Sequence, residues 1–266
     1  MHVPKRPLIT LAISAAFLAA LLVPTTGAVA ADGSKPTIVL VHGAFADPSS
    51  WSDVAPRLAK DGYTAVTPRL DLDSVAGDVA NVRAELDGIE GDKILVGHSY
   101  GGFVISNAAA GRSDVLGLVF TAAYVPTEGD SIASVSEGYL PPAFLAPGHL
   151  EFVDATSAII APAFFREDFA QDLSPKRAAA MAEAQQAVAL SILFTPSGPT
   201  PLDAMPSWYA VSAADRVIDP ALQRFMADRA GSTTVEFDDA SHAGGFTHYA
   251  ARFTKLIEDA ATATAD

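Results

Sequence analysis

The sequence predicts an α/β fold with one mostly parallel sheet of about six strands flanked by helices. Short runs rich in β-branched residues alternate with longer segments that carry apolar residues at helical spacing, which is the order of βαβ units. The chain has 266 residues, 50% of them hydrophobic, so it can bury one sizeable core. No repeat or low-complexity segment interrupts the order. We therefore expect a single folded domain over residues 31–266.

The expected strands are short apolar runs bounded by turn residues. Residues 37–41 read Thr-Ile-Val-Leu-Val, the continuous apolar pattern of a buried strand. In chain order, strands are expected at residues 37–41, 63–68, 93–96, 115–123, 207–212 and 233–237. The expected helices show apolar residues three and four apart, such as Trp51, Val54 and Leu58, before a stop at Gly62. In chain order, helices are expected at residues 51–61, 75–86, 99–110, 221–230 and 246–260.

Residues 126–206 break this alternation. No convincing strand appears there, Pro and Phe are frequent, and residues 169–193 have a helical pattern. The segment is too long for a loop and too apolar for a linker. We expect a helical, proline-punctuated insertion that lies as a cap over the C-terminal edge of the sheet. The alternative is additional scaffold helix away from the functional site.

The first thirty residues have the features of a secretory signal peptide. Lys5 and Arg6 precede an almost unbroken apolar run over residues 8–23, and residues 28–30 read Ala-Val-Ala, a small-residue cleavage site. We expect export to the periplasm or the exterior, without stable membrane association after cleavage. The alternative is a retained membrane anchor, because the apolar run approaches the length of a spanning helix.

Charge and cysteine content exclude several functions. Asp and Glu number 31 against 17 Lys and Arg, which gives a net charge of -14 that repels nucleic acids and anionic membranes. The absence of cysteine excludes disulfides, thiolate catalysis and thiolate zinc sites. A neutral or apolar small molecule is the expected partner, and no metal or organic cofactor is implied.

Residues 97–102 read Gly-His-Ser-Tyr-Gly-Gly and stand between an expected strand and an expected helix. This is the context of a nucleophile elbow, in which glycines permit a tight turn that presents the serine at the N-terminus of the helix. Backbone N–H groups and the helix dipole favour developing negative charge there. Ser99 is therefore the predicted nucleophile.

A serine needs a general base within reach, and histidine is the expected base. His242 lies in a loop between the last strand and the last helix, from which it can reach the elbow. His248, expected inside the last helix, is the alternative base. His98 is expected to be a packed structural residue, His42 to fix its own loop, and His149 to lie in the cap.

The third member of the site should be a carboxylate between the serine and the histidine in chain order. Asp215 directly follows the strand at residues 207–212, at a C-terminal strand end. Asp219 is the alternative, although it precedes Pro220 and fits better as a helix cap. Glu128 is a more distant possibility. The predicted oxyanion donors are the backbone N–H groups of Tyr100 and Ala44.

At these positions the chain resembles the α/β-hydrolase superfamily, over residues 35 to 262. The matching stretches are residues 41–45 (Val-His-Gly-Ala-Phe), 97–102, 215–218 (Asp-Arg-Val-Ile) and 241–242 (Ser-His). Within the superfamily it is similar to small bacterial esterases related to plant methylesterases and hydroxynitrile lyases. The resemblance implies the α/β-hydrolase fold, the triad Ser99, Asp215 and His242, and oxyanion donors at Ala44 and Tyr100.

The expected activity is hydrolysis of carboxylic esters of neutral or hydrophobic small molecules through an acyl-enzyme at Ser99. Gly43 stands where similar hydroxynitrile lyases have a hydroxyl-bearing residue, which favours hydrolysis. Lyase-like activity, a cofactor-free haloperoxidase or perhydrolase activity, and a non-catalytic receptor are the alternatives that the resemblance leaves. Six aromatic residues are expected either in the pocket wall or in the ordinary core: Phe45, Trp51, Tyr139, Phe144, Phe164 and Phe165.

Overall fold

A six-stranded sheet forms the scaffold of the computed structural model, which describes residues 1–2 and 35–265. The strands are β1 (Thr37–Val41), β2 (Ala65–Val66), β3 (Lys93–His98), β4 (Val115–Thr121), β8 (Ser207–Ser212) and β9 (Thr233–Phe237). They lie in the order β2-β1-β3-β4-β8-β9, and every neighbouring pair is parallel. The expected signal peptide lies outside the described residues and stays a prediction.

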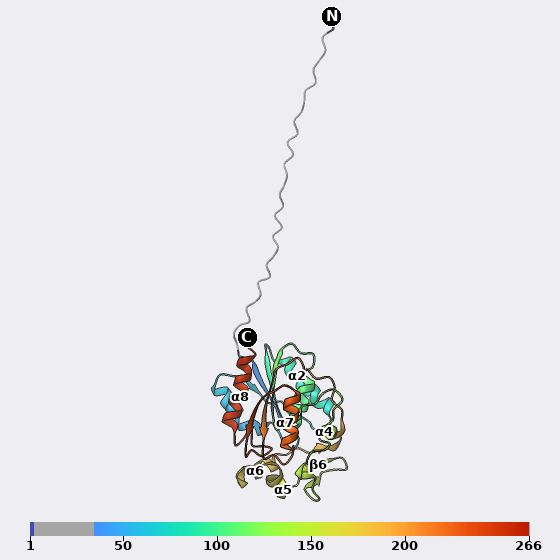
Figure 1. Ribbon diagram of the computed structural model, residues 1–266, viewed down its shortest axis with the longest axis vertical. Helices are drawn as coiled ribbons and strands as arrows, with labels where there is room; N and C mark the ends of the chain where they lie inside the picture. Colours follow the sequence, from blue (N-terminus) through green and yellow to red (C-terminus); the bar gives the residue numbers. More distant parts are fainter. Residues whose placement is uncertain (3–34, 266) are drawn as a thin grey trace. The chain divides into compact units, whose positions relative to one another are not determined.

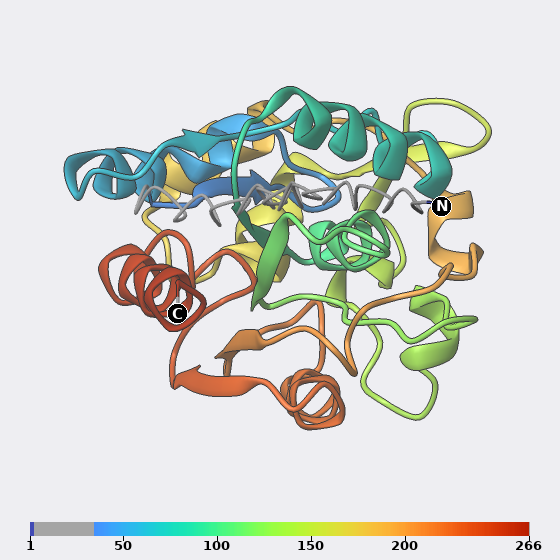
Figure 2. The same cartoon turned by 90° about the horizontal axis from the view of Figure 1, so that it is seen from above.

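Helices cover both faces of the sheet, as Figure 2 shows. One face carries α1 (Ala55–Lys60) and α8 (Ala250–Ala263). The other carries α2 (Val75–Gly88), α3 (Tyr100–Ala108) and α7 (Pro220–Arg229). The predicted α/β fold with a mostly parallel six-stranded sheet is therefore confirmed. In the part of the chain that the structure describes, no helix is long and apolar enough to cross a membrane.

Some predicted boundaries were wrong at the edges of elements. The strand expected at residues 63–68 shrinks to two paired residues, because β2 is an edge strand and Pro68 beyond it has no N–H to donate. The helix expected at residues 51–61 divides into a 3-10 helix, η1 (Pro48–Asp53), and α1. The last helix begins at Ala250, since residues 242–249 form turns instead.

The core lies on both faces of the sheet and reaches from α2 to α8. Ile94, Leu95 and Val96 of β3 are fully buried, as expected of a central strand covered on both sides. Trp51 is 1% exposed, and its ring lies 5.2 Å from that of Phe246. The two rings join η1 to the turns before α8, so Trp51 belongs to the core.

The segment between β4 and β8 contains both helices and strands, which corrects the expectation of an insertion without strands. Its helices are α4 (Ile132–Val135), α5 (Pro162–Phe169), α6 (Pro175–Glu183) and the 3-10 helices η2 (Ala143–Leu145) and η3 (Leu190–Phe194). A three-stranded antiparallel sheet joins β5 (Leu150–Phe152), β6 (Ser157–Ile160) and β7 (Val188–Ala189). Figure 1 shows α5, α6 and β6 beyond the end of the central sheet. We call residues 126–206 the cap.

The predicted helix at residues 169–193 was also wrong. Ala170 leaves the helical conformation, and Pro175 begins a new helix instead of continuing the previous one. The cap strands have two to four residues, too few for an alternating pattern to be recognised. The β5–β6 turn is formed by Asp154, whose carboxylate accepts hydrogen bonds from Thr156 and Ser157.

Candidate active site

Ser99 lies in a strained turn between β3 and α3. Its φ of 52° and ψ of -123° are unusual for a residue with a side chain, and such strain is concentrated at functional sites. The Ser99 carbonyl accepts hydrogen bonds from the N–H groups of Gly102 (3.0 Å) and Tyr124 (3.1 Å). The surrounding backbone therefore fixes the turn, and it presents Ser99 with 5% of its surface exposed.

The turn requires glycine at Gly101. A Cβ atom there would lie 2.4 Å from the carbonyl oxygen of Val41 and 2.6 Å from that of His42. Both contacts are to backbone atoms, which cannot rotate away. Gly101 therefore lets α3 start directly against the end of β1, at the predicted oxyanion loop.

His242 and Asp215 form a fully buried pair. His242 Nδ1 lies 2.8 Å from Asp215 Oδ2, and neither side chain is exposed. Because a carboxylate only accepts hydrogen bonds, Nδ1 carries the proton and Nε2 of the neutral ring has its lone pair free. Among the described residues, Nε2 of His242 is buried and has no hydrogen-bond partner. This nitrogen is available to accept a proton.

His98 joins the elbow to the His242 loop. Its Nε2 donates to the carbonyl oxygen of His242 (3.0 Å), and the two rings are 4.6 Å apart between centroids. Burial lowers the pKa of His98 well below its usual value, and the neighbouring His242 lowers it further. His98 directly precedes Ser99, so its neutral ring holds the loop of His242 against the elbow.

Asp215 is held by four hydrogen bonds. Besides His242, the carboxylate accepts from the backbone N–H groups of Val217 (2.7 Å) and Ile218 (3.1 Å) and from Gln223 Nε2 (2.7 Å). Gln223 lies on α7 and is fully buried. These donors fix the orientation of the carboxylate toward His242.

The alternative carboxylates lie elsewhere. Asp219 accepts a hydrogen bond from the N–H of Ala221 at the start of α7 and another from Leu140, as expected of a helix cap. Glu128 is exposed in the segment after β4. His248 is likewise exposed, in the turns before α8. The structure brings none of these three to the Asp215–His242 pair.

The remaining histidines have structural partners. His42 donates from Nδ1 to the carbonyl of Gly43 and accepts the Leu70 N–H at Nε2, so it fixes its loop as predicted. Burial lowers the pKa of His42 to about 4. His149 lies in the cap, where Nδ1 pairs with Asp168 at 2.7 Å.

Ser99 lines a cavity of about 300 Å³ between the elbow and the cap. Ala44 and Tyr100, the predicted oxyanion donors, line the same cavity. The side chains of its wall are mainly apolar or aromatic: Phe45, Tyr124, Ile132, Tyr139, Phe144, Phe169, Val188, Leu190, Ile192, Phe194 and Val217. No Asp, Glu, Lys, Arg or His is among the lining residues that the structure describes. The cavity therefore fits an uncharged, apolar molecule.

The family model for alpha/beta hydrolases matches residues 38–256. The chain is an alpha/beta hydrolase. A carbendazim hydrolyzing esterase from Nocardioides sp. (strain SG-4G) is 33% identical over 142 residues, which make up 47% of this chain and 58% of that protein. This hydrolase thus matches less than two thirds of the length of that relative.

Solved structures share the fold of the hydrolase. A pyrethroid hydrolase from Sphingobium faniae JZ-2 is 25% identical, with a TM-score of 0.73 over 86% of this chain and 98% of that one. A methylesterase from Arabidopsis has 16% identity and a TM-score of 0.69 over 84% of this chain and 98% of its own, and it shares the fold alone. The expected resemblance to bacterial esterases and plant methylesterases is confirmed.

The aromatic residues of the hydrolase that were candidate pocket walls divide into two groups. Phe45, Tyr139 and Phe144 line the cavity at Ser99. Phe164 instead stacks on the His149 ring in the cap. Phe165 is fully buried beside a second, smaller cleft.

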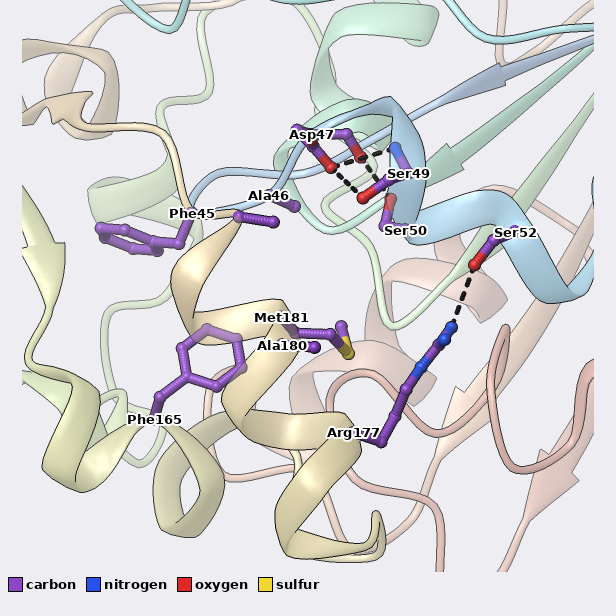
Figure 3. Close-up of a pocket in the computed structure, with 11 residues that line it drawn as sticks. Phe45, Ala46, Asp47, Ser49, Ser50, Ser52, Phe165, Arg177, Ala180 and Met181 are labelled. Atoms are coloured by element: carbon purple, nitrogen blue, oxygen red, sulfur yellow. Dashed lines mark hydrogen bonds between the residues drawn. The ribbon is translucent and has the colours of Figure 1, made fainter.

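Figure 3 shows this second cleft of the hydrolase, between η1 and α6. Arg177 of α6 reaches across it and donates to Ser52 (3.0 Å) and Asp53 (2.7 Å). Phe45 borders both this cleft and the cavity at Ser99. The cleft contains no proposed catalytic residue, and the Arg177 contacts attach the cap to the main domain.

Two polar residues near the site were missed by the sequence analysis. Gln223 supports Asp215, and Asp78 accepts a hydrogen bond from the Tyr100 hydroxyl at 2.8 Å. Each occupies a helix position next to buried apolar residues, a pattern that could have marked them. Their partners depend on how the helices pack and are not visible along the chain. Within the described residues, no three His, Asp or Glu side chains are grouped so that they could hold a metal ion.

Proposed function

We propose that this alpha/beta hydrolase is a serine carboxylesterase that acts on neutral, apolar esters through a triad of Ser99, His242 and Asp215. The single observation that carries the proposal is the buried Asp215–His242 pair, whose Nε2 atom lacks a partner. A buried imidazole nitrogen without a hydrogen bond is costly, so its presence needs an explanation, and a catalytic role supplies one. The strained Ser99 elbow supplies the nucleophile that such a base activates.

In the proposed mechanism, His242 Nε2 takes the proton of the Ser99 hydroxyl as Oγ attacks the ester carbonyl. Asp215 holds the tautomer and stabilises the imidazolium that forms. The tetrahedral intermediate collapses as His242 protonates the leaving alcohol, which leaves an acyl group on Ser99. Water, deprotonated by His242, then attacks the acyl-enzyme and releases the acid.

The backbone N–H groups of Tyr100 and Ala44 are the proposed oxyanion donors. Tyr100 is the first residue of α3, where a backbone N–H has no partner within the helix. Each such donor contributes about two to three orders of magnitude in rate. Gly43 precedes Ala44, and a Cβ atom there would lie 2.8 Å from the Cβ of Ser99. A hydroxyl-bearing side chain at this position would displace the nucleophile, which supports hydrolysis over the lyase alternative.

A fluorophosphonate probe tests the proposed nucleophile. We expect the purified protein to be labelled at Ser99, and Ser99→Ala to lose both labelling and ester hydrolysis. Ser106→Ala is the matched control, because this buried serine lies on the same helix and its hydroxyl donates only to the Gly102 carbonyl. We expect this variant to keep both. Absence of labelling in the wild-type protein would contradict the proposal and favour a receptor, whereas cyanide release from cyanohydrins would favour a lyase.

We also propose export of the hydrolase through cleavage of residues 1–30, on the evidence of the sequence alone. Expression in a bacterium with the native N-terminus tests this. The expected result is a periplasmic or secreted protein whose N-terminal sequence begins at residue 31. An uncleaved protein in the membrane fraction would instead support the anchor.

A further inference from the structure

Asp78 is a buried carboxylate with no role in the proposed triad. It lies on α2 and is fully buried. None of the ion pairs among the described residues includes it, although a buried charge without a cationic partner is costly. Burial raises the pKa of Asp78 from its usual value, and the hydrogen bonds from Tyr100, Leu72 and Asp71 oppose this rise. A buried carboxylate that lowers stability in this way needs a structural or functional reason.

One oxygen of Asp78 holds the residue after the proposed nucleophile. Its Oδ2 accepts the hydrogen bond of the Tyr100 hydroxyl at 2.8 Å, and Tyr100 is 1% exposed. Tyr100 begins α3, and its backbone N–H is a proposed oxyanion donor. The hydrogen bond of the phenolic hydroxyl therefore anchors the side chain of Tyr100, whose backbone N–H must point at the developing oxyanion.

The other oxygen of Asp78 holds the loop to which the cap is attached. Its Oδ1 accepts from the backbone N–H groups of Asp71 (2.9 Å) and Leu72 (3.1 Å). Leu72 has a φ of 62°, a left-handed conformation that is costly for a branched side chain. The carbonyl of Leu72 in turn accepts the N–H of Ala189 in cap strand β7 at 2.9 Å.

Strand β7 carries part of the cavity wall. Val188 and Leu190, the residues on either side of Ala189, both line the cavity at Ser99. A chain of hydrogen bonds thus runs from strand β7 through Leu72 to Asp78. From Asp78 it continues through the Tyr100 hydroxyl to the start of α3.

We propose that Asp78 is a positioning residue that sets the spacing between the oxyanion donor at Tyr100 and the cap wall at Val188 and Leu190. Its two oxygens have separate tasks, since Oδ2 orients the donor and Oδ1 places the wall. The inference rests on the proposed function, because it assumes an oxyanion at the Tyr100 N–H. It gives Asp78 a role in both turnover and the fit of the substrate.

The experiment compares Tyr100→Phe, Asp78→Asn and the double variant with the wild type on a small and a bulky apolar ester. Tyr100→Phe removes only the Oδ2 contact, so kcat should fall about tenfold with KM nearly unchanged on both esters. Asp78→Asn replaces one oxygen by an NH2 group and removes the negative charge that strengthens the contacts of both oxygens, so kcat should fall by a similar factor and KM should rise severalfold for the bulky ester. The kcat of the double variant should equal that of Asp78→Asn, because both changes break the same contact between the Tyr100 hydroxyl and the Asp78 side chain.

A second measurement separates positioning from loss of folding. A trifluoromethyl ketone forms an oxyanion when the serine adds to its carbonyl. The corresponding alcohol, which has no carbonyl group, does not. We expect Tyr100→Phe to weaken binding of the trifluoromethyl ketone about tenfold and to leave binding of the alcohol unchanged. If Asp78→Asn fails to fold, Tyr100→Phe alone decides the donor half, and wild-type kcat in that variant overturns the proposal.

Arg83→Gln is the matched control. Arg83 also lies on α2, but its guanidinium donates to the carbonyls of Asn107, Ala108 and Ala110 at the far end of α3. We expect a lower melting temperature with unchanged kcat and KM. Additive effects of the two changes at Asp78 and Tyr100, or equal losses of kcat in Arg83→Gln, contradict the inference. Absent labelling of Ser99 in the wild type contradicts the proposed function instead, so the two failures are distinguishable.

Discussion

At the scale of single residues, the four donors around Asp215 bear most directly on the proposed activity. Asp215→Asn preserves the shape of the side chain but places either an amide NH2 or a single oxygen opposite His242 Nδ1. The amide favours the wrong tautomer of the imidazole. We expect kcat to fall by about four orders of magnitude, as measured by steady-state ester hydrolysis.

Asp219→Asn is the control for this prediction. Asparagine caps helices as well as aspartate does, so α7 should keep its start and kcat should be unchanged. A larger loss of kcat in Asp219→Asn than in Asp215→Asn would mean that the proposed acid is wrong.

His42 makes stability depend on pH. Its pKa is lowered from 6.5 to about 4 in the folded state, so the unfolded chain binds this proton first as the pH falls. The contribution of the neutral ring is therefore complete above pH 6.5 and declines between pH 6.5 and 4. We expect the unfolding free energy lost in His42→Gln to shrink by about 2 kcal/mol between pH 7 and pH 5, measured by urea denaturation. An equal loss at both pH values would contradict this account.

The candidate site was predictable from the sequence where a residue type is rare and its local context is specific. Ser99 has the glycine-rich turn between a strand and a helix, and His242 and Asp215 each follow a predicted strand. The partners of Gln223 and Asp78 were not predictable, because they are Asp215 on another loop and Tyr100 on another helix. Tertiary packing, not local sequence, decides which buried polar groups meet.

At the scale of elements, the junction of β1 and α3 is the most sensitive contact in the scaffold. In Gly101→Ala the new methyl group would overlap the carbonyl oxygens of Val41 and His42, so β1 and α3 would have to separate. We expect about 3 kcal/mol of destabilisation by urea denaturation, together with reduced kcat, because β1 leads into the Ala44 loop.

Gly88→Ala is the control for this prediction. Gly88 is the last residue of α2, and a Cβ atom there meets nothing within 4 Å. Alanine has the higher helix propensity, so this variant should be as stable as the wild type or slightly more stable. A Gly101→Ala protein as stable as Gly88→Ala would show that the junction tolerates movement.

The inner strands of the sheet were predictable because each contains a continuous apolar run, as in β3 and β8. The cap was not predictable in detail. Its strands are short, and β6 pairs with β7, which lies at least 30 residues later in the sequence (Ala158 pairs with Val188), so the local pattern does not indicate the pairing. The break at Ala170 likewise depends on contacts of α5, whose last residue, Phe169, lies against His242.

At the scale of the whole molecule, the net charge of -14 predicts discrimination against anionic substrates. An ester that carries a negative charge is repelled during approach, and salt screens this repulsion. We expect kcat/KM for an anionic ester to rise between about 20 mM and about 200 mM NaCl, while kcat/KM for a neutral ester of the same size stays constant. Parallel salt dependence of the two esters would show that long-range charge does not influence selection.

The position of the cap within the crossover between β4 and β8 has a consequence for how new specificities arise. The free energy of closing a loop grows only with the logarithm of its length, by about 0.6 kcal/mol for each doubling. Insertions and deletions in this crossover therefore disturb the pairing of its two flanking strands very little. Natural variation can rebuild the wall of the cavity while Ser99, His242 and Asp215 stay on an unchanged frame, so relatives with different substrates need differ mainly in this one connection.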